Sequence, residues 1–106
     1  MKKEAIDFNV AVKDAFGEVV KEKDKTVMLN ASIVNILNHP HALPEEKKMD
    51  ATEIVKRLSL QQKVASKTPQ VYNTDELSVI RESVVNVYNK RMIPVELAGI
   101  ILKMTE

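Results

Sequence analysis

Residues 73–88 read NTDELSVIRESVVNVY and carry the clearest local pattern in the chain. Asn73 or Thr74 is suited to cap a helix, and two acidic residues follow in the first turn, where the helix dipole favours negative charge. The apolar positions then follow a spacing of three and four residues, which is typical of a helix with one buried face. They are Leu77, Ile80, Val84, Val87 and Tyr88. The pattern predicts a helix over residues 74–89.

A second helix is predicted before it, over residues 50–67. Asp50 is a good N-cap, and Glu53 stands three residues later, as in a capping box. Several positions then share one face, which is typical of an amphipathic helix. They are Ala51, Ile54, Val55, Leu58, Gln62 and Ala65. The basic side of this helix, with Lys56 and Arg57, is expected to face solvent.

A last helix is predicted over residues 94–104, with Pro94 in its first turn, where proline is well tolerated. This helix is apolar nearly all round, so most of its sides must be covered. The rest of the chain, a second copy of it or another protein would each supply that cover, and the sequence leaves all three open. The residues expected at such an interface are Val95, Leu97, Ile100, Ile101, Leu102 and Met104.

The N-terminal part is predicted to be β structure. Apolar and polar residues alternate over residues 5–13, which is typical of a half-buried strand. Asp14 and Gly17 suit a hairpin turn, because aspartate favours its first position and glycine accepts a positive φ. A return strand follows, and after a charged loop residues 26–29 form a third extended piece. We therefore expect a β-hairpin or a three-stranded meander over residues 5–29.

A short helix and a linker are predicted between these parts. Asn30 is suited to cap a helix over residues 30–38. Pro40 and Pro44 each restrict the residue before them, so residues 39–44 are expected to be a solvated linker. The complete prediction is an α+β fold in which the β structure packs on four helices. These helices span about residues 30–38, 50–67, 74–89 and 94–104, in a single domain of residues 1–106.

The composition argues against several classes of protein. The chain has 16 Lys and Arg against 15 Asp and Glu, so it lacks the strong positive charge of a general nucleic-acid binder. It has no cysteine, and therefore no disulfide, thiolate zinc site or cysteine nucleophile. No apolar run approaches the roughly 18 residues of a membrane span, and the first residues lack the apolar region of a signal peptide. We expect a soluble cytoplasmic protein.

The sequence holds no recognisable catalytic motif. Its two glycines cannot build a phosphate-binding loop, and no serine lies in a nucleophile motif. His39 and His41 would begin a metal site only if Glu45 or Glu46 completed it, because such sites need three or four ligands. A solvated linker is the simpler interpretation of the histidines. We expect no enzyme, no cofactor and no bound metal.

Basic residues gather on and beside the middle helix and after the next one. Such residues are candidates for contacts with phosphates or other anions, although a solvated helix face explains them as well. They are Lys47, Lys48, Lys56, Arg57, Lys90 and Arg91.

Short motifs occur in a particular order over most of the chain. They are Asp7-Phe8-Asn9, a turn ending at Gly17, Leu29-Asn30 with Val34-Asn35-x-Leu37, Glu53-x-Val55-Lys56-Arg57, Glu76-Leu77-x-x-Ile80 followed by Val84, and Pro94 with Ile100-x-x-Met104. In this order the chain resembles a family of short phage and prophage proteins. The matching positions are apolar and capping residues, so the resemblance implies a fold and a phage context but no catalytic residues.

These observations favour a small non-enzymatic phage or prophage accessory protein that acts by binding another protein, either alone or as a homo-oligomer. One alternative is a phage tail-assembly chaperone, because those proteins are also short and a hairpin followed by helices would suit one. A second alternative is a nucleic-acid-linked regulator that uses the basic residues, although the near-neutral charge makes nucleic acid an unfavoured partner.

Overall fold

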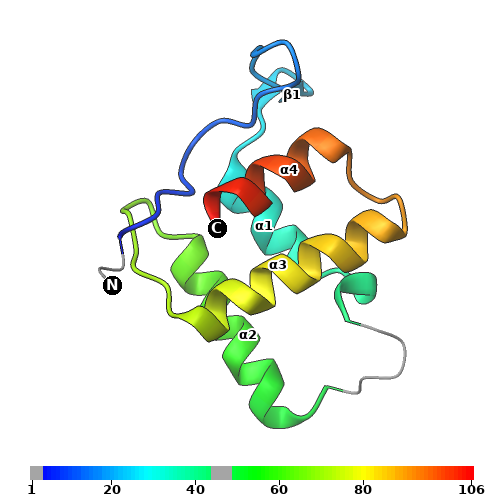
Figure 1. Cartoon of the computed structure of the whole chain (residues 1–106). Helices are drawn as coiled ribbons and strands as arrows, with labels where there is room; N and C mark the ends of the chain where they lie inside the picture. Colours follow the sequence, from blue (N-terminus) through cyan, green and yellow to red (C-terminus); the bar gives the residue numbers. More distant parts are fainter. Residues whose placement is uncertain (1–3, 44–48) are drawn as a thin grey trace.

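The computed structural model of the chain describes residues 4–43 and 49–106. In these two stretches a small antiparallel hairpin precedes four α-helices and one short 3-10 helix, so the predicted α+β fold is confirmed. The elements are β1 (Lys21–Glu22), β2 (Lys25–Thr26), α1 (Leu29–Leu37), η1 (Pro40–Ala42), α2 (Ala51–Val64), α3 (Thr74–Asn89) and α4 (Val95–Met104). Figure 1 shows α3 crossing the middle of the molecule, with α2 on one side of it and α4 with the hairpin on the other.

Helix α3 carries the centre of the core, as its apolar spacing predicts. Ile80, Val84 and Val87 are fully buried, whereas Tyr88 in the last turn is 36% exposed. Helices α1 and α4 and the 3-10 helix η1 all contact α3. The largest fully buried side chains on the other elements are Leu29, Ile33, Val64 and Ile101.

The ends of the helices test the predicted caps. Helix α3 begins with a complete capping box, in which Glu76 N–H donates to Asn73 Oδ1 at 2.7 Å and Asn73 N–H donates to Glu76 Oε1 at 2.9 Å. These bonds satisfy two of the backbone N–H groups that a helix start leaves open. The predicted cap at Asn30 is wrong, because α1 begins at Leu29 with Met28 in the cap position.

The N-terminal segment is extended, but it forms single bridges instead of the long predicted strand. Phe8 and Val12 are buried, as the alternation predicts, whereas Val10 is 38% exposed. The Phe8 ring meets Tyr72 edge-on with the ring centroids 5.4 Å apart. Burial, with a smaller effect from the Glu76 carboxylate, raises the pKa of Tyr72 to about 12. The bridges join Ile6 to Gln70, Ala11 to Met28 and Lys13 to Val19.

Two turns shape the β part. The predicted first turn is confirmed, because Asp14 Oδ1 accepts bonds from the N–H groups of Phe16 and Glu18, and Gly17 has a φ of 79°. The regular hairpin β1–β2 instead lies where a charged loop is expected. Its two central residues, Lys23 and Asp24, have φ values of 50° and 64°, as in a type I′ turn, which normally favours asparagine and glycine.

The segment predicted as a solvated linker is instead packed on α3. Residues 40–42 form η1, and Ala42 is only 1% exposed. Asn86 of α3 donates its side-chain N–H to the carbonyl of Ala42 at 2.9 Å. Pro40 does follow the end of α1, but its fixed geometry also suits the first position of η1, which packs against α3. Pro44, at the end of the predicted linker, lies outside the described residues.

Candidate functional site

Helix α2 exposes the face on which its apolar residues gather. The predicted cap is confirmed, since Glu53 N–H donates to Asp50 Oδ1 at 2.8 Å. Ile54, Val55 and Leu58 are 57%, 63% and 52% exposed. The side of α2 that packs against the core carries a different set of residues at helical spacing, namely Arg57, Leu60 and Val64.

The orientation of α2 corrects the predicted exposure of its two sides. Arg57 was expected on a solvated basic face, yet it is only 7% exposed. The sequence contains a second stripe at positions 57, 60 and 64, and the stripe with an arginine in it faces inward. We call the outward residues Met49, Ile54, Val55 and Leu58 the α2 apolar surface.

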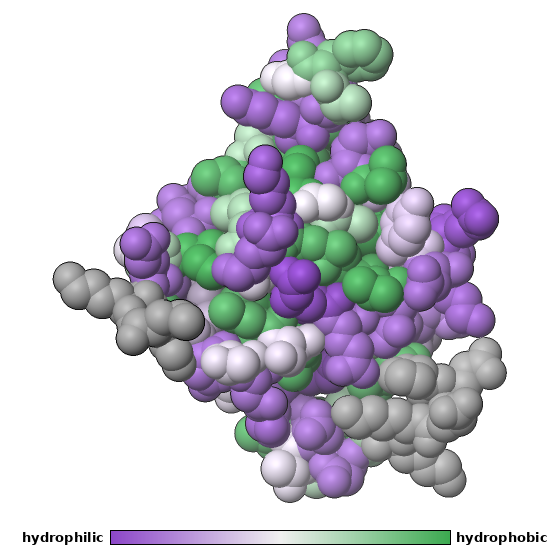
Figure 2. All heavy atoms as spheres, in the orientation of Figure 1, coloured by the Kyte–Doolittle hydropathy of each residue, from purple (hydrophilic) through white to green (hydrophobic). Residues whose placement is uncertain are grey.

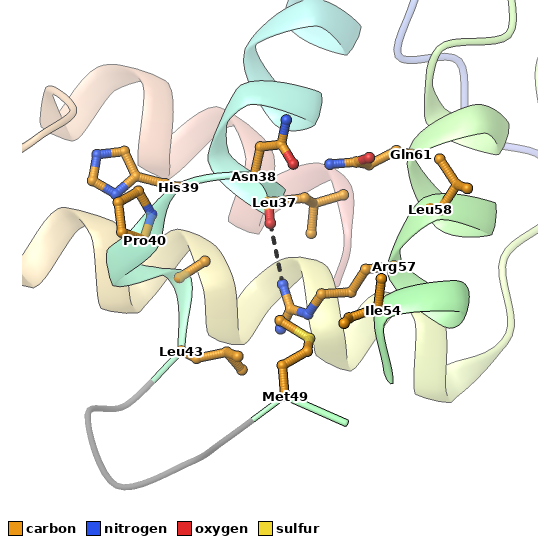
Figure 3. A pocket seen from close by; sticks show the side chains of 11 residues that line it. Leu37, Asn38, His39, Pro40, Leu43, Met49, Ile54, Arg57, Leu58 and Gln61 are labelled. Carbon is orange, nitrogen blue, oxygen red and sulfur yellow. Dashed lines mark hydrogen bonds between the residues drawn. The ribbon is translucent and has the colours of Figure 1, made fainter. Parts of the chain in front are cut away.

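A cleft of about 430 Å³ lies beside this surface. Its walls come from the end of α1 and from η1 on one side and from α2 on the other (Figure 3). That volume is within the range of about 300–1,000 Å³ that is usual for ligand pockets. The apolar side chains that line it include Leu37, Pro40, Leu43, Met49, Ile54 and Leu58.

Among the described residues that line this cleft, Arg57 is the only lysine or arginine. Its Nη1 donates to the carbonyl of Leu37 at 3.4 Å and to Ser83 Oγ at 3.2 Å. Its Nε is buried and has no hydrogen-bond partner. Burial lowers the pKa of Arg57, and the more distant carboxylates of Glu53 and Glu82 oppose that shift.

Arg57 makes no ion pair with any residue of the two described stretches, where the ion pairs are Lys56–Asp75 at 3.2 Å and Lys63–Glu76 at 2.9 Å. A guanidinium stays charged even when it is buried, so without a direct ion pair its desolvation is compensated by nearby dipoles and by more distant carboxylates. The end of α1 supplies one such dipole through the Leu37 carbonyl. Within the described residues, the cleft therefore contains a guanidinium that has no direct carboxylate partner.

The four described basic residues among the predicted anion contacts do not form one patch. Lys56 is exposed and pairs with Asp75 at the start of α3, while Arg57 is buried on another side of α2. Lys90 and Arg91 follow the end of α3, which is 16 residues long, so they lie roughly 20 Å from Asp75. Lys47 and Lys48 lie outside the described residues.

The residues predicted as an interface on α4 are mostly enclosed by the chain itself. Ile101 is fully buried in the core, so its prediction as an interface residue is wrong. Val95 is 59% exposed. Figure 2 shows hydrophobic side chains interspersed with hydrophilic ones over the part of this face where α4 lies. Four residues are partly buried and pack against the core, namely Leu97, Ile100, Leu102 and Met104. For these four residues, a role in an interface stays a prediction.

The two histidines lie at the start of η1. His39 Nδ1 accepts a bond from the backbone N–H of His41 at 3.1 Å, and the two rings are 5.4 Å apart. Within residues 4–43 and 49–106, no group of three or more His, Asp or Glu side chains is placed to hold a metal ion. Glu45 and Glu46, which would have completed such a site, lie outside the described residues.

A second cleft, also of about 430 Å³, separates the hairpin from α1 and the start of α4. It is lined by apolar side chains such as Val12, Ile36 and Leu97. Its charged residues, such as Lys13 and Glu96, are exposed and reach solvent. Of these two clefts, the one beside α2 is the one that combines an apolar wall with the buried Arg57.

Comparisons with known protein families, with curated proteins and with solved structures found no match. In the part of the chain that the structure describes, no helix has both the length and the apolar character needed to cross a membrane.

Proposed function

We propose that this chain is a non-enzymatic protein-binding module whose partner docks on the α2 apolar surface. The observation that supports this proposal is the exposure of Ile54, Val55 and Leu58, each more than half accessible on one helix face. Fully burying one such side chain contributes about 1.5–3 kcal/mol. A contiguous set of large apolar side chains on one helix is the usual way in which a helix presents a binding face.

The test compares one charged substitution on α2 with the same kind of substitution on α4. Leu58→Asp places a carboxylate in the middle of the α2 apolar surface, whereas Val95→Asp changes an equally exposed apolar residue elsewhere. Tagged wild-type and variant proteins are used to capture partners from cells that express the chain. We expect Leu58→Asp to lose the partner and Val95→Asp to retain it. Loss with Val95→Asp alone would move the interface to α4 and contradict the proposal.

The partner is either another protein or a second copy of the chain. Sedimentation of the purified protein distinguishes these cases, because self-association through α2 depends on concentration and disappears in Leu58→Asp. A monomer at all concentrations, together with a captured partner that the variant loses, supports a heterologous interface. A monomer that captures nothing specifically would contradict the proposed function.

The phage context is proposed on the resemblance to short phage and prophage proteins alone. The same capture experiment is therefore carried out in cells with and without replicating phage. Recovery of a tail-tube or tape-measure protein supports the tail-assembly chaperone. Recovery of a host protein supports an accessory role in the host cell.

A further inference from the structure

The buried guanidinium of Arg57 is costly in the structure as it stands. Both hydrogen bonds of the Arg57 side chain come from Nη1. The bond to the Leu37 carbonyl is 3.4 Å long and therefore weak. The Arg57 Nε is covered and unpaired. A buried polar group without a partner destabilises a fold, and an apolar residue of similar shape is often as stable or more stable there. An arginine at such a position points to a function outside folding.

We infer that the cleft over Arg57 binds a carboxylate of the docked partner protein, carried next to an apolar residue of that partner. This inference rests on the proposed function, because the partner that covers the α2 apolar surface is the source of the carboxylate. It adds the chemistry by which the partner is recognised. Either an acidic side chain or a chain terminus supplies this group.

A carboxylate fits this cleft better than a phosphate does. The edge of a guanidinium that carries Nε and Nη2 presents two parallel donors, which match the two oxygens of a carboxylate. A phosphate carries more charge and is normally held by several cations or backbone N–H groups. Among the described residues of the cleft wall, Arg57 is the single lysine or arginine, and most of the others are apolar.

The walls of the cleft also explain how a ligand reaches the guanidinium. Figure 3 shows the side chains of Met49 and Ile54 beside Arg57, on the side of the cleft. Methionine has three rotatable bonds and adapts easily, so rotation of Met49 opens the approach to Nε. The apolar part of the ligand then contacts Ile54 and Leu58, which line the cleft and also belong to the α2 apolar surface.

The test uses small probes that differ in one charge. N-acetyl-leucine carries a terminal carboxylate beside an apolar side chain, and N-acetyl-leucinamide is its neutral counterpart. A second pair, N-acetyl-glutamate α-amide and N-acetyl-glutaminamide, tests a side-chain carboxylate. Binding is followed by two-dimensional NMR, with the Arg57 Nε–H signal and the backbone signals of Ile54 and Leu58 as reporters.

We expect at least one carboxylate probe to shift the Arg57 Nε–H signal and to bind about tenfold more tightly than its amide. The pair that shows this preference identifies the source of the carboxylate. Equal binding of acid and amide in both pairs would overturn the inference, because the cleft would then be apolar only. No shift with any of the four probes would overturn it as well.

The variant Arg57→Met keeps the length of the side chain and removes the charge. We expect its midpoint of urea unfolding to be unchanged or higher, and its preference for the carboxylate probe to disappear. A large fall in the midpoint would show that Arg57 serves the fold, and would contradict the inference. Ser83→Ala is the control, since it removes one bond to Arg57 but leaves the charge in the cleft.

Partner capture separates this inference from the proposed function. If Leu58→Asp loses the partner and Arg57→Met retains it at full strength, the α2 apolar surface is the interface and the carboxylate anchor is refuted. If both variants lose it and Arg57→Met stays folded, both proposals are supported. If neither loses it, the proposed function itself fails.

Discussion

Helix α4 has two charged residues among its ten, Glu96 and Lys103, whereas α2 has four charged residues among its 14. Nevertheless α4 places Ile101 in the centre of the core, and α2 leaves Ile54 and Leu58 more than half exposed. The difference lies in the neighbours, because α4 packs against the central helix α3 while α2 packs mainly against the short helix α1. Position in the bundle, and not mean hydropathy, decides which apolar side chains water reaches.

The largest effect is expected in α4. Ile101→Ala removes a fully buried side chain and should lower the free energy of unfolding by about 2–5 kcal/mol. Val95→Ala, on the same helix but 59% exposed, should change it by no more than about 0.5 kcal/mol. Urea unfolding of both variants measures the difference, and equal losses would show that α4 is not enclosed as described.

The same comparison is sharper within α2, where two leucines stand two residues apart. Leu60 is 4% exposed and Leu58 is 52% exposed. Leu60→Ala should cost about 2–3 kcal/mol, whereas Leu58→Ala should cost less than about 0.5 kcal/mol. Thermal or urea unfolding gives both values. The reverse order would mean that α2 packs by its apolar face, as its pattern alone suggests.

Arg81 offers a contrast to Arg57, because it is an arginine that serves the fold. Its Nη1 donates to the carbonyl of Leu102 at 2.6 Å and to Thr105 Oγ1 at 3.0 Å, which satisfies the end of α4. Arg81→Met should therefore destabilise the protein by about 1–2 kcal/mol, whereas Arg57→Met should not. Lys103→Met controls for the lost charge, since Lys103 is exposed on α4. Equal unfolding midpoints for the two arginine variants would contradict this contrast.

The smallest effect is expected from pH, at the junction of α2 and α3. Burial alone would raise the pKa of Glu76, but bonds from Asn73 N–H and Lys63 Nζ outweigh it, so the pKa is lowered in the fold. Glu76 therefore contributes stability above its unfolded pKa and loses it as pH falls through the folded value. The contribution is about 1 kcal/mol or less, because the pair is partly exposed.

Comparing Glu76→Gln with the wild type measures this contribution. The difference in their free energies of unfolding should be constant from neutral pH to about pH 5 and should then shrink as the pH falls further. A difference that grows in acid would mean that the sign of the pKa shift is wrong.

Caps and apolar spacing in the sequence predict where the helices lie along the chain, but they do not predict which face of α2 packs inward. The cap at Asn73 and the spacing of Ile80, Val84 and Val87 act within a few residues, so sequence alone places α3 correctly. The face of α2 depends on distant neighbours, and both of its stripes are compatible with a helix. The basic residues on the stripe with Arg57 therefore predict a solvated side, and nothing local reveals that Arg57 bonds to Leu37 and Ser83.

The β part is confirmed in outline, but its regular hairpin is shorter than the predicted strands. The turn at Asp14 and Gly17 follows from its own residue types and was predicted. The second turn, at Lys23 and Asp24, falls inside the charged loop that the sequence predicts, but its two positive φ values were not predicted, because lysine rarely adopts them. The contacts that the surrounding strands make must hold that turn in place.

The bridge between Ile6 and Gln70 joins residues 64 positions apart (70 − 6), and Phe8 meets Tyr72 over the same separation. Closing so long a loop before other contacts exist carries a large entropic cost, which falls once the helices between have formed. The N-terminal segment should therefore attach late in folding. It should also be the first part to detach, so that amide exchange at Ile6 and Gln70 is faster than in α3.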